Sequence, residues 1–200
     1  AKGPFLGKDM EGGGRGSNAW AVSPEKSSTG RPILCNDTHL VLSTPGIWYL
    51  NHLHSEDGFH CLGSTIPGLP GVLLGHNEDI AWGITLAFTD VEDIFVEKVD
   101  VTNPEKYEYL GESRDFELIE EVIQVKGEDD HVEKIQYTEH GPLIGSVTEH
   151  SGQAIALCSK SLTPNTILEG FLKINVATNW DDFSQGVEKI QAPQLNFTYS

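Results

Sequence analysis

Short apolar segments separated by glycine, proline and polar turns run through most of the chain after residue 16. Their length and their β-branched and aromatic content are typical of β-strands. We predict strands at 20–22, 33–35, 47–53, 59–62, 71–75, 80–86, 94–99, 116–125, 132–138, 143–147, 154–159 and 196–199. Helical periodicity appears late, over 168–176 and over a second helix that begins at Asn179 or Asp181 and reaches Ile190. The pattern predicts an α+β chain that is rich in strands, with a few late helices.

Residues 1–16 differ in composition from the rest of the chain, with six glycines and few apolar residues. Such a segment is typical of a flexible linker, so we predict the end of a spacer or propeptide over 1–16 and one folded domain over 17–200. The chain lacks an initiator methionine and an apolar leader segment, and a predicted strand runs up to its end. We therefore expect a processed or excised piece of a longer protein.

Acidic residues outnumber basic ones, with 30 Asp and Glu against 13 Lys and Arg and a formal net charge of −17. This balance argues against binding to nucleic acid or to an anionic membrane surface, because both need a basic face. No apolar run approaches the length of a membrane span. Residues 90–139 hold 17 acidic and 5 basic side chains, which predicts solvated outer strands.

The three cysteines are Cys35, Cys61 and Cys158, and their spacing fits no metal motif. They are too few for a disulfide scaffold. We interpret them as small buried residues, with one disulfide and a free thiol as the alternative.

Three histidines, His52, His54 and His60, are candidates for a zinc site. Residues 52 and 54 point to the same side if the segment is a strand. No carboxylate–histidine motif or other ligand signature accompanies them in the sequence, so we expect no metal there. We expect His76 to lie in a turn and to be hydrogen-bonded in the interior.

One serine stands where the glycine-rich head meets the first predicted strand, in the segment Gly16-Ser17-Asn18-Ala19-Trp20. If the chain were cut before Ser17, that residue would carry both a hydroxyl and a free α-amine. Together they form a nucleophile and a base, because an α-amine has a pKa of about 7.7–8.0 and can accept a proton near neutral pH. A serine after glycine is otherwise typical of an ordinary turn.

This segment resembles the processing site of the penicillin acylase (penicillin amidase) family of N-terminal nucleophile hydrolases. Further segments match the family in order: 32–39 (PILCNDTH), 67–71 (PGLPG), 75–83 (GHNEDIAWG), 90–93 (DVED), 140–142 (HGP) and 179–199. The resemblance spans residues 17–200. It implies part of a four-layer αββα sandwich, made as a precursor that cuts itself before the serine.

The resemblance also implies an amidohydrolase that removes an acyl group from an amine, as in penicillins, acyl-homoserine lactones or related amides. Ser17 matches the nucleophile that forms the acyl-enzyme, with its own α-amine as base. His39 matches a position that supports this amine, and Leu86 matches the position whose backbone N–H helps to form the oxyanion hole. Four aliphatic residues match positions that line the acyl pocket: Leu40, Leu73, Leu74 and Ile84. The alternative is that some of these four fill the space between the sheets.

In some family members, residues that match Asp90, Asp93 and the carbonyl of Glu92 form part of a calcium site. Hard oxygen ligands suit Ca²⁺, but the ion needs about six to eight of them, so an acidic turn without metal is the alternative. The resemblance implies no organic cofactor, a small-molecule amide as substrate, and a periplasmic or extracellular location.

The sequence departs from the family pattern in its extent. It holds no acylase α chain and lacks the later part of the β chain, which in the family supplies the second oxyanion donor and the remaining calcium ligands. Both are expected partners in the full-length protein. Because the Gly16–Ser17 bond is intact here, the nitrogen of Ser17 is an amide and cannot act as a base. We therefore expect this chain itself to be unprocessed and inactive.

The alternative function is a non-catalytic, acidic, β-rich binding module with a flexible head. Cleavage before Ser17 separates the two hypotheses, because a binding module has no reason to cut itself there. An ordinary Ser-His-Asp hydrolase is disfavoured, because the sequence has no G-x-S-x-G elbow.

Overall fold

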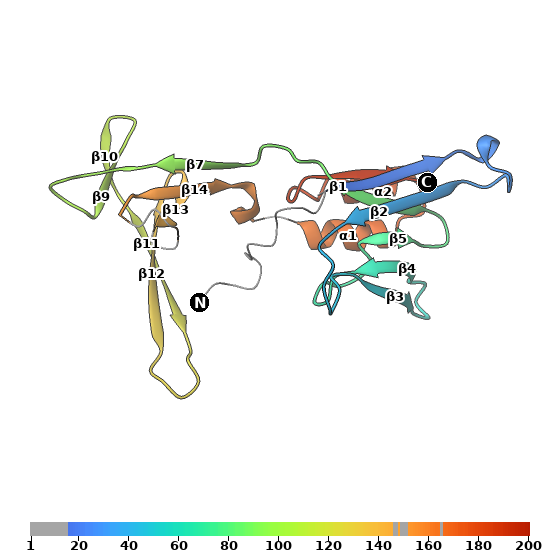
Figure 1. Ribbon diagram of the computed structural model, residues 1–200, viewed down its shortest axis with the longest axis horizontal. Helices are drawn as coiled ribbons and strands as arrows, with labels where there is room; N and C mark the ends of the chain where they lie inside the picture. Colours follow the sequence, from blue (N-terminus) through green and yellow to red (C-terminus); the bar gives the residue numbers. More distant parts are fainter. Residues whose placement is uncertain (1–15, 146–147, 149–151, 165) are drawn as a thin grey trace. The chain divides into compact units, whose positions relative to one another are not determined.

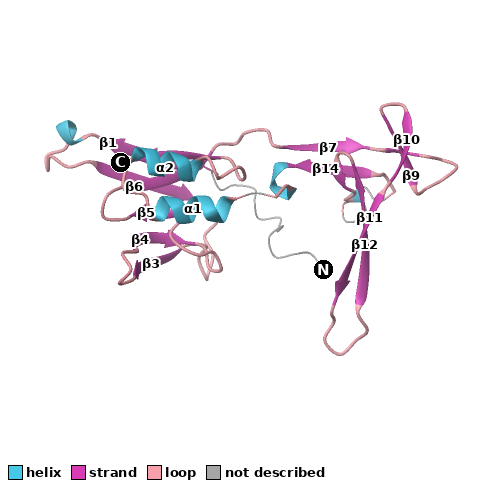
Figure 2. Cartoon of the chain, turned by 180° about the vertical axis from the view of Figure 1, so that it is seen from behind, coloured by secondary structure: helices cyan, strands magenta, loops and turns pink. Residues whose placement is uncertain are grey.

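The computed structural model describes residues 16–145, 148, 152–164 and 166–200, which form two compact units (Figures 1 and 2). The described part of unit 1 comprises residues 16–89, 164 and 166–200, and unit 2 lies between 90 and 163. Residues 1–15 of the predicted spacer lie outside the described residues, and Gly16 is already the first residue of a strand. Along the chain, unit 2 lies between the two segments of unit 1, within the stretch 17–200 that was predicted as one domain.

A five-stranded antiparallel sheet is the centre of unit 1, with its strands in the order β15-β6-β5-β4-β3. Their bounds are Tyr49–His54 (β3), His60–Thr65 (β4), Leu74–His76 (β5), Ala81–Leu86 (β6) and Leu195–Tyr199 (β15). β6 and β15 lie far apart in the sequence but pair from Leu86 opposite Leu195 to Trp82 opposite Tyr199. The two chain segments on either side of unit 2 therefore meet in one sheet.

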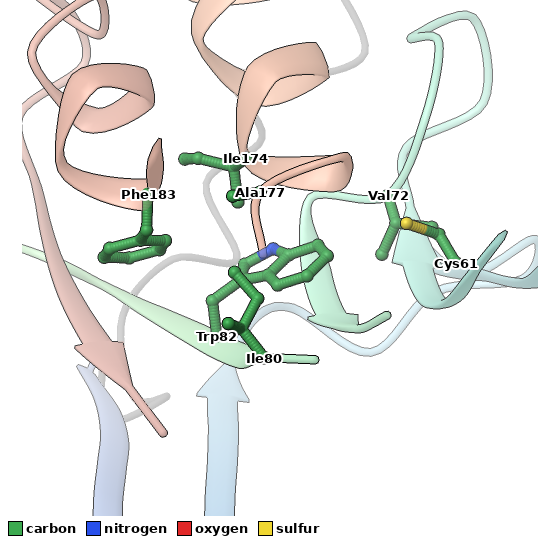
Figure 3. Close-up of a cluster of buried hydrophobic side chains, with 7 residues drawn as sticks. All are labelled: Cys61, Val72, Ile80, Trp82, Ile174, Ala177 and Phe183. Carbon is green, nitrogen blue, oxygen red and sulfur yellow. The ribbon is translucent and has the colours of Figure 1, made fainter. Parts of the chain in front are cut away.

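Two helices, α1 (Ile167–Asn175) and α2 (Trp180–Val187), cover one face of this sheet (Figure 3). The indole N–H of Trp82 donates to the backbone O of Leu73 at 3.0 Å, so its polar atom is satisfied inside the core. A Cβ added to Gly170 of α1 would lie 2.7 Å from the backbone O of Gly186, so glycine lets the helices approach closely. The buried cluster between the helices and the sheet comprises Cys61, Val72, Ile80, Trp82, Ile174, Ala177 and Phe183.

Asn175, the last residue of α1, is 1% exposed and joins the helix to the loop before β5. Its Oδ1 accepts from the N–H of Val72 and its Nδ2 donates to the O of Val72, both at 2.7 Å. Its own backbone O accepts from Asn77 Nδ2 at 3.1 Å and from Cys61 Sγ at 3.0 Å. Burial raises the pKa of the Cys61 thiol to about 11, which keeps it a donor at neutral pH.

A two-stranded sheet of β1 (Gly16–Val22) and β2 (Ile33–His39) packs on the other face of the five-stranded sheet. The turn between them contains a short 3₁₀ helix, Pro24–Lys26. On β6, Trp82 points to the helices, whereas a Cβ added to Gly83 would lie 2.9 Å from Cβ of Asn36. Glycine at this position allows the two sheets to approach. Unit 1 therefore has three layers: helices, five-stranded sheet and two-stranded sheet.

Unit 2 consists of small antiparallel sheets, with strand orders β10-β9-β8, β11-β12-β13 and β14-β7. Its buried side chains include Tyr107 and Phe116, whose ring centroids lie 5.0 Å apart. A 3₁₀ helix, Lys160–Leu162, follows the last strand. The strand bounds are Glu92–Val96 (β7), Lys98–Val99 (β8), Lys106–Tyr109 (β9), Glu112–Asp115 (β10), Glu117–Ile123 (β11), His131–Thr138 (β12), Gly141–Pro142 (β13) and Ile155–Ser159 (β14).

The prediction of a strand-rich chain with late helices is confirmed. Asn179 is the N-cap of α2, because its Oδ1 accepts from the N–H of Asp182 at 3.0 Å. The strand predicted at 143–147 is wrong over its described residues 143–145, where Leu143 makes an isolated bridge to Ala156. Within the described part of the chain, no helix is long and apolar enough to cross a membrane.

One hairpin and the exposure of one cysteine were not predicted. The hairpin β9–β10 lies in a charged stretch with little apolar alternation, and it turns at Leu110 and Gly111, whose φ angles of 51° and 84° suit a tight hairpin turn. The interpretation of all three cysteines as buried is wrong for Cys158, which is exposed on β14, and Cys35 is half-buried. All three cysteines lie in the described residues and are free thiols.

Candidate active site

Ser17 lies one residue after the beginning of β1 and is half-buried. It is held there by pairing with Thr38 of β2. Its Oγ donates a hydrogen bond to the backbone O of Gly16 at 2.7 Å. The hydroxyl therefore already contacts the carbonyl group of the peptide bond that precedes it.

His39, at the end of β2, lies opposite Gly16. Its Nε2 is 2.9 Å from Oδ2 of Asp37, and because an ionised carboxylate only accepts, Nε2 carries the hydrogen. Asn18 Nδ2 lies 3.3 Å from the same nitrogen, but an amide nitrogen only donates, so this longer contact is not a hydrogen bond when Nε2 carries the hydrogen. In the neutral ring the lone pair is then on Nδ1, which lies 3.7 Å from the position of a Cβ on Gly16. A basic nitrogen is thus placed next to the Gly16–Ser17 peptide.

The β6 edge that faces β5 positions the backbone of Leu86. The pairing of β5 with β6 ends before Ile84, and the side chain of Asn36 takes the place of the missing strand. Asn36 Oδ1 accepts from the N–H of Ile84 at 2.9 Å, and its Nδ2 donates to the O of Ile84 at 3.0 Å. Because N–H directions alternate along a strand, the N–H of Leu86 points to this same edge.

Asn36 also connects this edge to the serine, because its Nδ2 donates to the backbone O of Asn18 at 2.9 Å. One side chain therefore holds together the residue after Ser17 and the residue two before Leu86. The roles of Asn36 and Asp37 were not predicted. The available signal was a polar pair directly after the predicted strand 33–35, where an asparagine amide can compete with the backbone ladder.

The four residues predicted to line an acyl pocket do not share one environment. Leu73 and Ile84 are 5% and 8% exposed, whereas Leu40 is 43% exposed and Leu74 is half-buried. Ile84 lies two residues after Trp82 on β6, so it points to the side of the sheet that the helices cover. Leu40 and Leu74 are the accessible pair.

The predicted calcium ligands lie at the beginning of unit 2. Glu92 and Asp93 belong to β7, and Glu92 Oε1 accepts from Ser159 Oγ at 2.8 Å. The backbone O of Val91 accepts a hydrogen bond from the N–H of Lys160, directly after β14. Because carbonyl directions alternate along a strand, the carbonyl of Glu92 points away from β14. That carbonyl and the carboxylates of Asp90 and Asp93 are oxygens of the type that Ca²⁺ prefers, though fewer than its full set. In the described ranges, no group of three or more His, Cys, Asp or Glu side chains could hold a metal ion.

The expectation that no metal binds at the histidine group stays a prediction, but the structure surrounds this group with contacts that the sequence did not show. A carboxylate does accompany it, because Glu78 Oε1 lies 2.9 Å from His60 Nδ1. Glu78 is 18 residues from His60 along the chain, so no local motif could have revealed the pair. His76 makes a hydrogen bond from Nδ1 to the backbone O of Asn77 at 2.9 Å, but it is exposed rather than interior.

A serine near the beginning of a strand, with its hydroxyl on the preceding carbonyl, is the arrangement expected of an N-terminal nucleophile hydrolase before cleavage. The family model described as penicillin amidase matches residues 3–200. The chain belongs to the penicillin amidase family.

The chain is similar to two curated acylases. It is 30% identical over 197 residues to an acyl-homoserine lactone acylase QuiP from Pseudomonas aeruginosa, covering 92% of this chain and 23% of that protein. It is 36% identical over 139 residues to the penicillin acylase 2 proenzyme of Pseudomonas sp. SE83, covering 69% of this chain and 18% of that protein. The chain therefore spans less than a quarter of these relatives.

A solved acylase structure matches the fold of this chain. The thermostable penicillin G acylase from Alcaligenes faecalis matches 91% of this chain with a TM-score of 0.75 and 30% identity. The match covers 33% of that acylase chain. The strand-rich chain with two late helices thus matches part of a penicillin G acylase.

Proposed function

We propose that this chain is the part of an acylase that carries its nucleophile, Ser17, and that the whole protein hydrolyses amides after cutting itself between Gly16 and Ser17. The observation that carries the proposal is the 2.7 Å hydrogen bond from Ser17 Oγ to the Gly16 carbonyl O. Family membership supports the reaction type. The chain would form part of a four-layer αββα sandwich, whose first three layers have the order seen in unit 1.

The proposed cleavage begins at the peptide bond that Ser17 already contacts. After a small rotation, Oγ attacks the carbonyl carbon of Gly16, and His39 Nδ1 accepts the hydroxyl proton. The bond from this carbon to the nitrogen of Ser17 breaks, the nitrogen takes up a proton, and an ester between Gly16 and Ser17 Oγ remains. Water then hydrolyses the ester, which leaves a Gly16 carboxylate and a free Ser17 amine and hydroxyl.

The same groups would then serve amide hydrolysis. The free α-amine has a pKa of about 7.7–8.0, so it can take the proton of Ser17 Oγ near neutral pH. Oγ attacks the substrate carbonyl, the amine product leaves with a proton, and water hydrolyses the acyl-enzyme. The N–H of Leu86 is the proposed donor to the developing oxyanion, a type of contribution worth about 2.7–4 kcal/mol per donor.

The substitution Ser17→Ala in the protein that contains this chain tests the proposal. We expect no cleavage before residue 17 and no amide hydrolysis, because neither step has a nucleophile. Intact mass spectrometry and N-terminal sequencing measure the first, and release of a chromogenic amine measures the second. Ser17→Cys is expected to retain cleavage, because a thiol is also a competent nucleophile.

Ser27→Ala is the matched control, since Ser27 is a half-buried turn serine ten residues further along the same hairpin. It should leave both readouts unchanged. Normal cleavage or turnover in the Ser17→Ala protein would contradict the proposal and favour the binding-module alternative. In this chain, with the Gly16–Ser17 bond intact, we expect one species and no hydrolysis.

We also propose that the acyl group is aliphatic. The residues at the predicted pocket positions are branched aliphatic side chains, which offer no flat wall for stacking an aromatic ring. The accessible pair, Leu40 and Leu74, suits an alkyl chain, and each buried CH₂ contributes about 0.8 kcal/mol. Amides with acyl chains of increasing length should show higher kcat/KM than a phenylacetyl amide. The reverse order would reject the preference without affecting the role of Ser17.

For the whole protein we propose a calcium site that includes Asp90, Asp93 and the carbonyl of Glu92. The ion would stabilise the entry to unit 2, and further oxygens must come from elsewhere, because three are too few. Asp93→Asn should weaken calcium binding measured by calorimetry. The remaining acylase segments are the proposed partners, and a periplasmic or extracellular location is proposed from family membership.

A further inference from the structure

Three polar side chains meet on one face of the two-stranded sheet, near the beginning of β1. Asn18 of β1 lies directly opposite Asp37 of β2, and His39 lies two residues after Asp37. Residues opposite one another in a sheet share a face, and so do residues two apart on one strand. Asn18, Asp37 and His39 are therefore neighbours, and Gly16 lies opposite His39 in the same register.

Asp37 and Asn18 both contact the same ring nitrogen of His39. Nε2 lies 2.9 Å from Asp37 Oδ2 and 3.3 Å from Asn18 Nδ2. The two contacts require opposite states of this nitrogen. An ionised carboxylate only accepts, so its hydrogen bond needs a hydrogen on Nε2, whereas an amide nitrogen only donates, so its hydrogen bond needs the lone pair there. The tautomer of the neutral ring therefore decides which of the two contacts is a hydrogen bond.

The contact with Asp37 is the stronger of the two. It is shorter, and a hydrogen bond to an ionised acceptor is about twice as strong as one between neutral groups. The hydrogen is therefore on Nε2 and the lone pair on Nδ1, which lies 3.7 Å from the position of a Cβ on Gly16. If Asp37 were removed, Asn18 would be left as the partner of Nε2 and would favour the lone pair on that nitrogen. The lone pair would then leave Nδ1, the nitrogen beside Gly16.

We propose that Asp37 is a positioning residue for the cleavage before Ser17, because it selects, against Asn18, the tautomer of His39 with a free lone pair on Nδ1. The inference rests on the proposed role of His39 as the base of that cleavage. Asp37 acts through the imidazole ring and forms no bond with the reacting atoms. It adds no step to the cleavage and determines only which ring nitrogen can accept the proton.

Nuclear magnetic resonance of the ring nitrogens tests the tautomer in the full 200-residue chain. Histidine labelled with ¹⁵N is observed at about pH 8, where ordinary imidazoles are neutral, and the chemical shift separates a nitrogen that carries hydrogen from one that does not. The spectrum of His39→Gln identifies the signals of His39 among the eight histidines. We expect the hydrogen on Nε2 in the wild type and on Nδ1 in Asp37→Ala.

Two further variants test whether Asp37 and Asn18 compete. Asp37→Glu keeps a carboxylate that only accepts, so it should retain the wild-type tautomer. Adding Asn18→Ala to Asp37→Ala removes the competing donor, so the hydrogen should return at least partly to Nε2. Asp57→Ala is the matched control, because Asp57 is an exposed turn aspartate of the same unit. It should leave the signals of His39 unchanged, and far-UV circular dichroism verifies the fold of each variant.

The rate of cleavage between Gly16 and Ser17 tests the consequence in the protein that contains this chain. A general base contributes about 10²–10⁴-fold, so His39→Gln should slow cleavage by that factor. Asp37→Ala should slow it at least about tenfold and no more than His39→Gln does, because it leaves the base in the wrong tautomer. Asp37→Glu and Asp57→Ala should cleave at nearly the wild-type rate. Intact mass spectrometry over time measures all of these rates.

The outcomes separate this inference from the proposed function. A hydrogen that stays on Nε2 in Asp37→Ala would overturn the selection of the tautomer by Asp37. Slow cleavage in His39→Gln together with wild-type cleavage in Asp37→Ala would overturn the role of Asp37 and leave His39 as the base. Wild-type cleavage in His39→Gln would overturn the proposed base itself, and the role of Asp37 in cleavage with it, whereas Ser17→Ala would still test the nucleophile.

Discussion

The two units of this chain use β-structure in different ways. In unit 1, helices bury one face of the five-stranded sheet, and Trp82 and Ile174 are 0% exposed. In unit 2, strand residues keep much of their apolar surface exposed, as at Ile94, Val96 and Leu118 with 59%, 70% and 58%. Unit 1 is therefore held by packing, whereas unit 2 depends more on strand register and polar contacts.

Unit 2 has a polar centre in place of a large apolar one. The side chain of Glu97 is 4% exposed, and its Oε1 accepts from Thr138 Oγ1 at 2.7 Å and from His140 Nδ1 at 2.8 Å. The His140 ring stacks on Phe95 with centroids 3.8 Å apart. Buried polar contacts of this type are directional, so they fix geometry with little apolar area. The proposed catalytic residues all lie in the unit that has the packed core.

The chain offers a spectroscopic separation of the two units. Its four tryptophans, Trp20, Trp48, Trp82 and Trp180, all belong to unit 1. Tryptophan fluorescence therefore reports unfolding of unit 1, whereas far-UV circular dichroism reports both units.

The largest expected effect is the loss of packing in unit 1. Ile174→Ala removes a fully buried side chain between α1 and the sheet, and it should lower the free energy of unfolding by about 2–5 kcal/mol. Urea unfolding followed by tryptophan fluorescence measures this, since all four tryptophans remain. The control Val101→Ala alters a residue that is 99% exposed in unit 2 and should change stability by less than about 0.5 kcal/mol. Similar midpoints for the two variants would contradict a packed core around Ile174.

The next effect concerns the polar centre of unit 2. Glu97→Ala removes the acceptor of His140 Nδ1 and leaves the Thr138 hydroxyl only the longer bond to Gly141 O, so it should destabilise unit 2 by about 1–3 kcal/mol. The loss should appear in the circular dichroism transition and not in tryptophan fluorescence. Glu117→Ala, at an exposed glutamate of the same unit, is the control. An equal shift of both signals would mean that the two units unfold together.

The difference between the units also decides what the sequence could predict. β6 and α1 were predicted almost at their observed bounds, because a buried face imposes an apolar period on the sequence. The hairpin β9–β10 was missed, because five of its eight strand residues are charged and its strands show little apolar period. The spacing of apolar residues along the sequence reflects burial. Strands in a unit that buries little apolar surface are therefore harder to predict from the sequence.

The candidate active site shows a second limit of prediction from sequence. The positions of Ser17, His39 and Leu86 came from family resemblance, and patterning alone gave no contact between them. The side chain of Asn36 bonds to Asn18, 18 residues before it, and to Ile84, 48 residues after it, and the second bond exists only once the two sheets are packed. Such contacts depend on the layer arrangement, which no local motif contains.

The smallest expected effect lies in the β11–β12 ribbon of unit 2. The register places Glu120 opposite Lys134 and Glu121 opposite Glu133. Lys134 Nζ is 3.0 Å from Glu120 Oε1, so one cross-strand pair attracts while its neighbour repels. Because residues 90–139 hold 17 acidic and 5 basic side chains, the repulsive pair lies in a region of excess negative charge.

Glu121→Lys replaces this repulsion by attraction and should stabilise unit 2 by about 0.2–1 kcal/mol. The matched variant Glu120→Lys should have the opposite sign, because it places two lysines opposite one another on the other face of the ribbon. Both changes are exposed, so both effects should shrink as salt rises and screens the charges. Thermal unfolding by circular dichroism at low and high salt measures them. A reversed order of the two variants at low salt would show that the strands pair in another register, since a slip of one residue places Glu121 opposite Lys134 or Glu120 opposite Glu133.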